Sequence, residues 1–209
     1  MKALVTGGRG GIGSAICALL DEPVVLDLPE FDVGEPDAWR ALDGEFDAAF
    51  LNAGIVTGER DPAALGDEQY RRVVRTNVDG VVFGIRECAG RLMPGGGSIV
   101  VTASLAGLRD VPLDPVYALT KHAVVGLVRS VAPHLAVRGI RINSICPGLV
   151  DTTMASDELR ELVGVELMEP AFVAEAALRV LEDDETGRAR VVQPNRVEPF
   201  RFPGVPGPR

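Results

Sequence analysis

Residues 6–13 read TGGRGGIG, and they join an apolar, β-branched stretch at 2–7 to a helical pattern at 11–20. Glycines at such a junction permit a tight turn, so the backbone can approach a pyrophosphate closely. The following helix offers free N–H groups and the positive end of its dipole to the same anion. A glycine turn without a ligand is the alternative, because one Gly-rich stretch is a weak signal. The strand–glycine–helix order predicts the first unit of a parallel sheet that binds a dinucleotide.

The alternation of strands and helices continues along the chain. Further strands are predicted at 23–28, 46–54, 97–104, 139–148 and 189–195, and further helices at 67–92, 114–137, 152–164 and 169–184. Most strands are continuous apolar runs, which is typical of a parallel sheet covered on both faces. We therefore expect an α/β fold, a Rossmann-like doubly wound parallel sheet in three α/β/α layers with right-handed crossovers.

A single domain is expected over residues 1–197. The length of 209 residues suits one domain, and neither a repeat nor a linker interrupts it. The tail at 198–209, EPFRFPGVPGPR, is rich in Pro and Gly, which argues against a helix or a central strand. It is expected to be either a disordered end or an extended arm packed on a neighbouring subunit.

Composition excludes several classes of function. The formal net charge is −9, so nucleic acid is not an expected partner, because phosphate binding needs a basic face. No apolar run approaches about 18 residues, which argues against a membrane span. The start, MKALVTGG, leaves no room for a signal peptide, so a cytoplasmic location is expected. The three cysteines are far apart and the two histidines lack partners at metal-ligand spacing, so neither a disulfide framework nor a metal site is expected.

Asp27 ends the second strand, 20 residues after Gly7. A carboxylate at this place can accept hydrogen bonds from the adenosine ribose hydroxyls, and it would repel a 2′-phosphate. The following Leu28 and Glu30 supply no positive charge. The sequence therefore favours NAD over NADP, with Arg9 as the one basic group that could reverse this preference.

Asn52, Ala53 and Gly54 end the third strand. Their small size would let the chain run close to the adenosine side of a dinucleotide. Gly54 could also simply mark a turn at the end of the strand.

Tyr117 and Lys121 stand at i and i+4 on a predicted helix, so their side chains lie on one face, one turn apart. A free tyrosine has a pKa near 10 and is a poor base, but a nearby ammonium stabilises the phenolate and lowers that pKa. The pair could therefore accept or return a proton. An amphipathic helix whose lysine only reaches for solvent is the alternative. The chain has two tyrosines and two lysines, however, so a chance pairing at this spacing is rare.

Ser104 and Asn77 are two further polar candidates. Ser104 ends a strand thirteen residues before Tyr117, where its hydroxyl could polarise a substrate C–O bond or could only cap the strand end. Asn77 lies in a long apolar helical pattern, where a buried amide needs a partner. It could interrupt that helix and hold a water that passes protons onward, or it could face solvent.

These residues carry a resemblance to a known family. T-G-x-x-x-G-I-G, N-A-G, T-N-V, S-L-A-G, Y-x-x-x-K and P-G-x-V-x-T follow one another in the order of the short-chain dehydrogenase/reductase family, and the resemblance covers residues 2–193. It implies that Tyr117 is the general acid/base and that Lys121 lowers the pKa of this tyrosine and binds the nicotinamide ribose. It also implies that Ser104 orients the substrate and that Asn77 supports a proton relay through water.

The resemblance implies a reaction, a cofactor segment and an assembly. The reaction would be a reversible hydride transfer between nicotinamide C4 and a small-molecule secondary alcohol or ketone. The segment PGLVDT at 147–152 matches the part that holds the nicotinamide carboxamide. Helices 67–92 and 114–137 pair across subunits in the family, so a homodimer or homotetramer is expected. A non-catalytic dinucleotide-binding sensor on the same fold is the alternative. The expected cofactor-binding residues are Gly7, Arg9, Gly11, Ile12, Gly13, Asp27, Leu28, Asp32, Val33, Asn52, Ala53, Gly54, Tyr117, Lys121, Pro147, Gly148, Val150 and Thr152.

Two branches of the family look most similar, the 15-hydroxyprostaglandin dehydrogenase-like and the type II 3-hydroxyacyl-CoA dehydrogenase-like members. The first shares SLAGL, PVYALTKHAVVGLVRS and ICPGLVDT, and the second shares the VVLDL strand. Asp114 departs from the first branch, which carries a substrate-orienting Gln three residues before the tyrosine. Because a carboxylate is unfavourable beside an apolar substrate, prostaglandin-like specificity is not expected.

The segment after Asp27 is shorter than in the family, whose members carry a helix and a further parallel strand before N-A-G. Here Asp32-Val33, which resembles the family's adenine-contacting D-V, follows Asp27 within five residues. A parallel neighbour needs a crossover of about a dozen residues, so the outer strand and its preceding helix are expected to be missing or vestigial. The sequence thus predicts a sheet of six strands with an open adenine pocket, and a small lid after Thr152.

Overall fold

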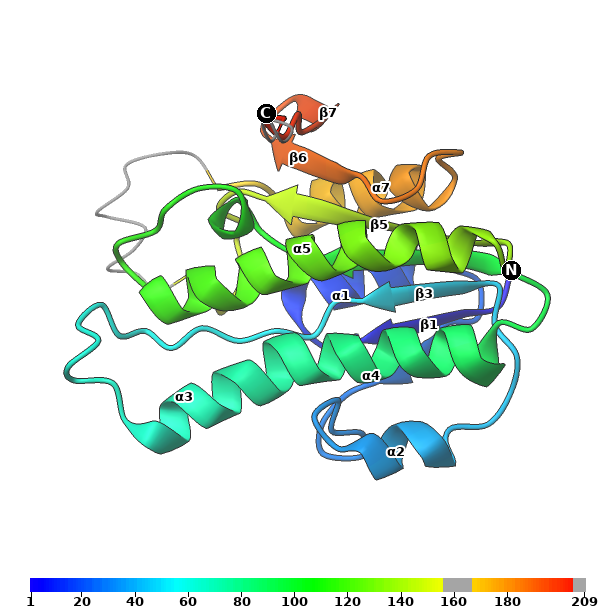
Figure 1. The fold of residues 1–209 in the computed structure, drawn as a ribbon, viewed down its shortest axis with the longest axis horizontal. Coiled ribbons are helices and arrows are strands. Elements are labelled where there is room, and N and C mark those ends of the chain that lie inside the picture. Colours follow the sequence, from blue (N-terminus) through cyan, green and yellow to red (C-terminus); the bar gives the residue numbers. More distant parts are fainter. Residues whose placement is uncertain (156–166, 205–209) are drawn as a thin grey trace, which may run out of the picture.

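The computed structural model describes residues 1–155 and 167–204, which form a three-layer α/β fold around one sheet (Figure 1). The strands are β1 (Ala3–Thr6), β2 (Val24–Leu26), β3 (Ala48–Leu51), β4 (Gly97–Thr102), β5 (Ile140–Pro147), β6 (Ala189–Gln193) and β7 (Arg196–Pro199). Their spatial order is β2-β1-β3-β4-β5-β6-β7. The chain leaves β1 in both directions, so the strand order reverses between β1 and β3. Sheets of this kind bind ligands at the carboxyl ends of the strands beside such a switch point.

Helices cover both faces of the sheet. Those of the described residues are α1 (Gly11–Ala18), α2 (Pro36–Ala41), α3 (Asp67–Val74), α4 (Gly80–Glu87), α5 (Pro115–Ala136) and α7 (Pro170–Leu181). Figure 1 shows α2, α4 and α5 on one face, and α1 packs beside α7 on the other. Two π-helical turns, Arg75–Asp79 and Cys88–Leu92, join and extend α3 and α4. The helix predicted at 67–92 is thereby confirmed as one continuous rod.

The two apolar layers come from alternate residues of the same strands. Leu4 and Leu51 belong to the core cluster beneath α2, α4 and α5, whereas Val5 and Phe50 belong to the cluster beneath α1 and α7. Successive side chains of a strand point to opposite faces. Because both faces are covered, successive residues must all be apolar, which explains the continuous runs in the sequence.

The prediction of six strands is wrong by one edge strand. The six predicted strands are all present and parallel, but β7 adds a seventh that pairs antiparallel with β6. The turn between them places Asn195 at a φ of 58°, a conformation that asparagine tolerates. Pro and Gly in this region argued against a helix or a central strand, and β7 is neither. Pro199 ends an edge strand, where a missing N–H is tolerated.

The expected loss of the outer strand is confirmed. No strand lies between β2 and β3, a stretch that falls wholly within the described residues, so β2 is an edge of the sheet. The short helix α2 was not predicted, because its six residues are too few to show a helical period. It buries Trp39, whose indole N–H donates to the carbonyl of Val33 at 2.8 Å.

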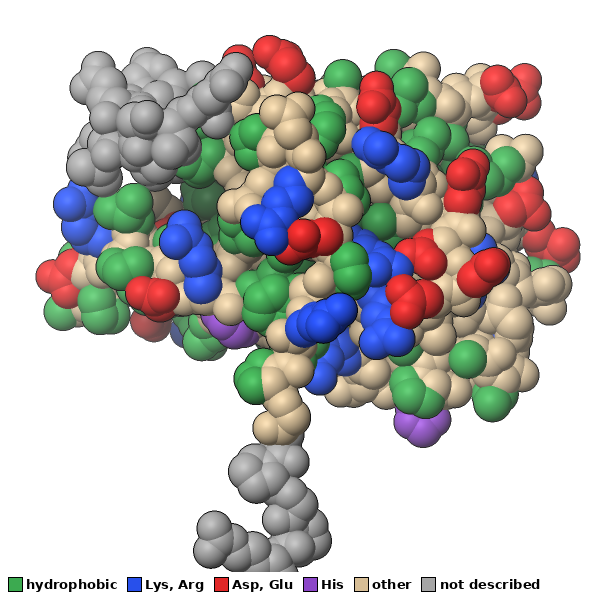
Figure 2. Space-filling model, turned by 90° about the horizontal axis from the view of Figure 1, so that it is seen from above, with side chains coloured by type: hydrophobic (Ala, Val, Ile, Leu, Met, Phe, Trp, Pro, Cys, Tyr) green, Lys and Arg blue, Asp and Glu red, His purple; other side chains and the backbone are tan. Residues whose placement is uncertain are grey.

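Phe200 and Phe202, which follow β7, pack on their own chain. The Phe200 N–H donates to the carbonyl of Ala189 at 2.8 Å, and Phe200 and Phe202 pack against the core beside α5. The guanidinium of Arg129 on α5 lies 3.7 Å from the centre of the Phe202 ring. Figure 2 shows this end of the molecule, where basic and acidic side chains are interspersed.

Most of the helix predicted at 152–164 lies outside the described residues, as does the end of the tail. No helix within the described ranges is long and apolar enough to cross a membrane.

Candidate active site

The carboxyl ends of β1, β3, β4 and β5 meet at one edge of the sheet, because these strands are parallel neighbours. The Thr6 hydroxyl accepts hydrogen bonds from the N–H groups of Asn52 at 2.9 Å and Ala53 at 3.1 Å. The Asn52 amide donates to the carbonyls of Thr6 and Gly7, at 3.3 and 3.4 Å. Its oxygen accepts from the Thr102 hydroxyl at 3.0 Å. The glycine turn, N-A-G and the end of β4 therefore form one bonded unit.

Close contacts require three glycines of the turn. Gly7 has a φ of +63°, and a Cβ there would lie 2.9 Å from the Cα of Ala53. A Cβ on Gly13 would collide with the Gly7 carbonyl. The start of α1 can therefore lie against the end of β1 only if residue 13 has no side chain. A Cβ on Gly11 would strike Thr152. No side chain of the described residues caps the N-terminus of α1, so its first N–H groups suit an anion.

Asp27 lies beside this turn. Its carboxylate accepts hydrogen bonds from the N–H groups of Arg9 and Leu28, each at 2.8 Å. The Arg9 guanidinium binds the Glu30 carboxylate at 2.5 Å and the Leu28 carbonyl at 2.7 Å. The hydrogen bond with Glu30 raises the pKa of Arg9, and the same bond lowers the pKa of Glu30. The positive charge of Arg9 is thus compensated within the protein.

Three other predicted cofactor residues also have partners within the protein. The Asp32 carboxylate accepts from the Arg75 guanidinium at 2.7 Å. Val33 is buried, and its carbonyl accepts the indole N–H of Trp39. Ile12 packs against the core cluster beneath α1 and α7. The adenine contacts expected of Asp32 and Val33 stay a prediction.

Tyr117, Lys121 and Ser104 come together at the same edge. The Lys121 ammonium lies 5.5 Å from the centre of the Tyr117 ring, and it donates to the Thr102 carbonyl at 2.9 Å. The Ser104 side chain lies close enough to the Tyr117 hydroxyl to lower the pKa of this tyrosine. A Cβ on Gly54 would lie 3.3 Å from the Lys121 nitrogen, so the ammonium reaches the end of N-A-G.

Burial dominates the ionisation of this cluster. It raises the pKa of Tyr117 to about 12, although the Ser104 side chain acts in the opposite direction. It also lowers the pKa of Lys121 to about 8. The net shift of the tyrosine pKa is opposite to the one expected from the ammonium alone, because burial penalises the phenolate.

Asn77 lies in the π-helical turn between α3 and α4 and is 1% exposed. Its oxygen accepts from the Ile55 N–H at 2.8 Å, and its amide donates to the Ile55 carbonyl at 2.8 Å. The amide also donates to the Thr120 hydroxyl at 3.0 Å, which donates to the Tyr117 carbonyl at 2.7 Å. Asn77 therefore holds the chain after β3 against the N-terminal part of α5.

The segment at 147–152 leads from β5 toward the glycine turn. Val150 pairs with Met168 in an isolated parallel bridge, and most of the chain between them lies outside the described residues. Thr152 lies against Gly11 at the N-terminus of α1. The segment predicted to hold the nicotinamide thus ends beside the predicted pyrophosphate site.

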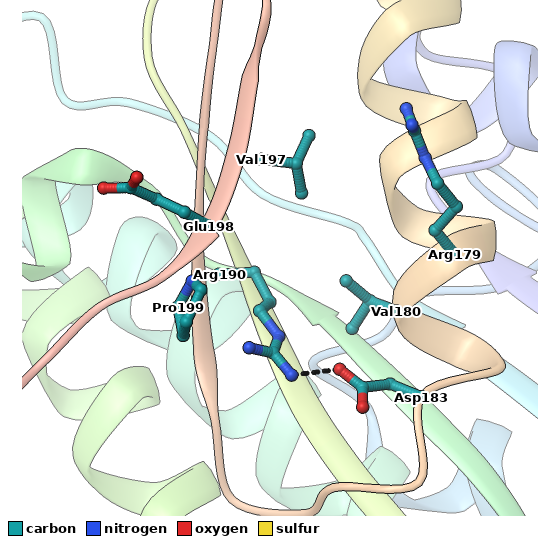
Figure 3. A pocket seen from close by; sticks show the side chains of 7 residues that line it. All are labelled: Arg179, Val180, Asp183, Arg190, Val197, Glu198 and Pro199. Atoms are coloured by element: carbon teal, nitrogen blue, oxygen red, sulfur yellow. Dashed lines mark hydrogen bonds and ion pairs between the residues drawn. The ribbon is translucent and has the colours of Figure 1, made fainter.

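A pocket of about 260 Å³ lies away from this edge, between α7 and the β6–β7 hairpin (Figure 3). Arg190 projects into it and forms ion pairs with Asp183 and Glu185. The pocket contains no predicted catalytic or cofactor residue, since it is lined by Arg179, Val180, Asp183, Arg190, Val197, Glu198 and Pro199.

The sequence reasoning missed the connection between Asp114 and Thr57. Asp114 is 7% exposed, and its carboxylate accepts from the Thr57 N–H and hydroxyl. The sequence contained one usable signal, since Asp followed by Pro is typical of an N-cap and the first helical position. It contained none for Thr57, because the bond spans 57 residues of sequence.

The glycine turn at the switch point of a doubly wound sheet, with Tyr, Lys and Ser at the same edge, is the arrangement of a Rossmann-fold oxidoreductase. Comparison with known proteins supports this class. A family model described as enoyl-(acyl carrier protein) reductase matches residues 36–189. The cyclohexanol dehydrogenase of an Acinetobacter species is 32% identical over 220 residues, covering 87% of this chain and 88% of that enzyme. The chain belongs to the short-chain dehydrogenase/reductase family.

Other relatives agree with this assignment. The 3beta-hydroxysteroid dehydrogenase of Mediterraneibacter gnavus is 35% identical over 150 residues, which cover 68% of this chain and 54% of that enzyme. A short-chain type dehydrogenase/reductase structure from Mycobacterium marinum has a TM-score of 0.80 at 27% identity, with 91% of this chain and 93% of that chain covered. The closer likeness to the 15-hydroxyprostaglandin and 3-hydroxyacyl-CoA dehydrogenase branches is not confirmed and stays a prediction.

Proposed function

We propose that this protein is an NAD-dependent dehydrogenase that transfers a hydride reversibly between nicotinamide C4 and a secondary alcohol or ketone. The observation that carries the proposal is the cluster of Tyr117, Lys121 and Ser104 beside the strand ends that hold the glycine turn. Relatives named cyclohexanol and hydroxysteroid dehydrogenases support a small-molecule alcohol or ketone as the substrate.

The glycine turn at 6–13, together with Asp27 and the segment at 147–152, fits a dinucleotide. A side chain at Gly7 or Gly13 would collide with the backbone of Ala53 or Gly7, so this tight turn requires glycines. The uncapped helix start suits a pyrophosphate. Asp27 would bind the adenosine ribose, and the segment at 147–152 would hold the nicotinamide carboxamide. When bound, NAD supplies the carbon that accepts or returns the hydride.

The side chains of the catalytic cluster take complementary roles. Tyr117 as the phenolate takes the proton from the alcohol during oxidation, and as the phenol it returns the proton during reduction. The Ser104 hydroxyl holds the same substrate oxygen by a hydrogen bond. Lys121 binds the nicotinamide ribose and, as an ammonium, stabilises the phenolate. The Asn77 oxygen and the Lys121 nitrogen both lie close to Gly54, at 3.5 and 3.3 Å from the position of a Cβ there. Asn77 would support a proton relay from Lys121 through water.

The preference for NAD over NADP rests on two carboxylates. Asp27 would repel a 2′-phosphate, and Glu30 neutralises Arg9, the basic group of the turn.

We also propose a cytoplasmic homodimer or homotetramer formed through α4 and α5. Val82 on α4 and Leu119 on α5 are 38% and 53% exposed, as an apolar contact surface requires.

The proposal is tested by following the absorbance of reduced nicotinamide with NAD and a panel of secondary alcohols. Turnover is expected for the wild type and is expected to disappear in Tyr117→Phe. Turnover that survives this substitution would contradict the catalytic assignment. Tight NAD binding without turnover on any alcohol would favour the sensor instead.

A further inference from the structure

The Asp114 carboxylate joins two segments that are far apart in sequence. It is the N-cap of α5, where one oxygen accepts from the Tyr117 N–H at 2.9 Å and the Thr57 hydroxyl at 2.6 Å. The other oxygen accepts from the N–H groups of Thr57 at 2.8 Å and Gly58 at 2.9 Å. Each oxygen therefore accepts two hydrogen bonds, which compensate the charge of a group that is only 7% exposed.

The loop that Asp114 binds is also held by two other elements. Asn77 binds both backbone groups of Ile55, and the Gln69 amide on α3 donates to the Thr57 carbonyl at 2.6 Å. In Figure 1 this loop, which follows β3, passes between α3 and α5. It is thus fixed from both sides at the place where N-A-G leaves the sheet.

We propose that Asp114 is a positioning residue, which fixes the loop at 55–58 to the first turn of α5 and so sets the place of the Tyr117 side chain, without touching the substrate. This inference rests on the proposed function. Tyr117 is the third residue of α5, so its side chain moves with the helix start that Asp114 caps. Because each carboxylate oxygen already accepts two hydrogen bonds, Asp114 has no acceptor site left for a hydrogen bond with the substrate.

Two substitutions separate the two halves of this connection. In Asp114→Asn the amide oxygen can still accept from the N–H groups of Thr57 and Gly58. Its NH2 group can donate to the Thr57 hydroxyl but faces the Tyr117 N–H, so only the helix cap is lost. Asp114→Ala removes both halves. Asp110→Asn is the matched control, because this exposed carboxylate lies on the same segment, four residues earlier.

Amide hydrogen exchange tests the connection without reference to activity. Asp114→Ala is expected to speed exchange at Thr57, Gly58 and Tyr117, whereas Asp114→Asn is expected to speed it at Tyr117 alone. Unchanged exchange at Tyr117 in Asp114→Asn would overturn the proposal, even if Asp114→Ala does not fold. This result stands whether or not the wild type oxidises an alcohol, so it is separate from the test of the proposed function.

Kinetics test the consequence for catalysis. We expect Asp114→Ala to lower kcat about 10- to 100-fold, since small displacements of a reacting group are costly. Asp114→Asn should lower it less than Asp114→Ala does, because the bonds to Thr57 and Gly58 are kept. The ratio of kcat/KM for a cationic amino alcohol to that for a neutral alcohol of equal size should not change. A change of that ratio in Asp114→Asn would show that the carboxylate faces the substrate and would overturn the proposal.

Discussion

Lys121 and Tyr117 lie one turn apart on the same side of α5, with 5.5 Å between the ammonium nitrogen and the centre of the phenol ring. The Thr102 carbonyl, at the end of β4, accepts a hydrogen bond from this ammonium. The ammonium is therefore fixed relative to both the helix and the sheet, beside a phenol whose pKa is raised by burial to about 12.

Replacing Tyr117 by Phe should lower kcat by about 10²- to 10⁴-fold, because the proton acceptor is removed while the ring still fills its place. NADH binding, measured by its fluorescence, should change little. Tyr70→Phe is the matched control, since Tyr70 is the second tyrosine of the chain and is 43% exposed. Equal losses in the two variants would argue against a catalytic phenol.

Lys121 should make the free energy of unfolding depend on pH. Its pKa is lowered by burial to about 8, from an ordinary value of 10.5. Between these values the unfolded chain binds more protons than the folded one, so stability should rise as pH increases from about 8 to 10.5. The full rise is roughly 3 kcal/mol at 1.36 kcal/mol per unit of pKa.

Lys121→Met is the reference for this measurement. Denaturant titrations of the cofactor-free protein across that range should give a rise for the wild type that the variant lacks. The raised pKa of Tyr117 acts at higher pH and in the opposite direction, lowering stability as pH increases above 10. Parallel pH curves for wild type and Lys121→Met would contradict the buried ammonium.

Replacing Glu30 by Gln should release Arg9 toward the adenosine end of the nucleotide site. The guanidinium now binds Glu30 and the Leu28 carbonyl. Without the carboxylate, we expect NADPH binding to tighten roughly three- to tenfold while NADH binding changes little. Glu22→Gln removes an exposed carboxylate before β2 and serves as the control. If NADPH binds equally to both variants, Glu30 has no part in cofactor selection.

Gly13→Ala should destabilise the protein and weaken NAD binding together. The added Cβ would meet the backbone carbonyl of Gly7, which cannot move without displacing the turn. Overpacking of this kind costs about 1–3 kcal/mol. Gly90→Ala provides the comparison, because a Cβ there meets nothing within 4 Å. Thermal unfolding with and without NAD should separate the two variants, and similar curves would show that Gly13 has room for a side chain.

The strands that are covered by helices on both faces could be predicted from the sequence, because such parallel strands consist of continuous runs of apolar residues. The long rod at 67–92 was predictable for a similar reason, since its apolar positions repeat with a helical period. β7 was not, because edge strands tolerate Pro and need little hydrophobicity. α2 was too short to show a period.

In the candidate site, local motifs identified the residues that the fold brings together, such as Tyr117 with Lys121. What sequence could not provide is the partner of each polar side chain. Asp114 was considered as a group facing the substrate, yet its carboxylate is buried against Thr57 and Gly58. This pairing depends on how the loop after β3 packs against α5, so the spacing of residues along the sequence cannot predict it.

The loss of the outer strand has a consequence for how the protein avoids strand pairing at the edge of its sheet. It turns β2 into the border of the sheet, and a border strand exposes unpaired N–H and C=O groups to which a foreign chain could add. β2 spans three residues, so it offers an incoming strand little length along which to pair. The short length of β2 therefore protects this edge from strand addition, as charged side chains or a covering helix do in other sheets.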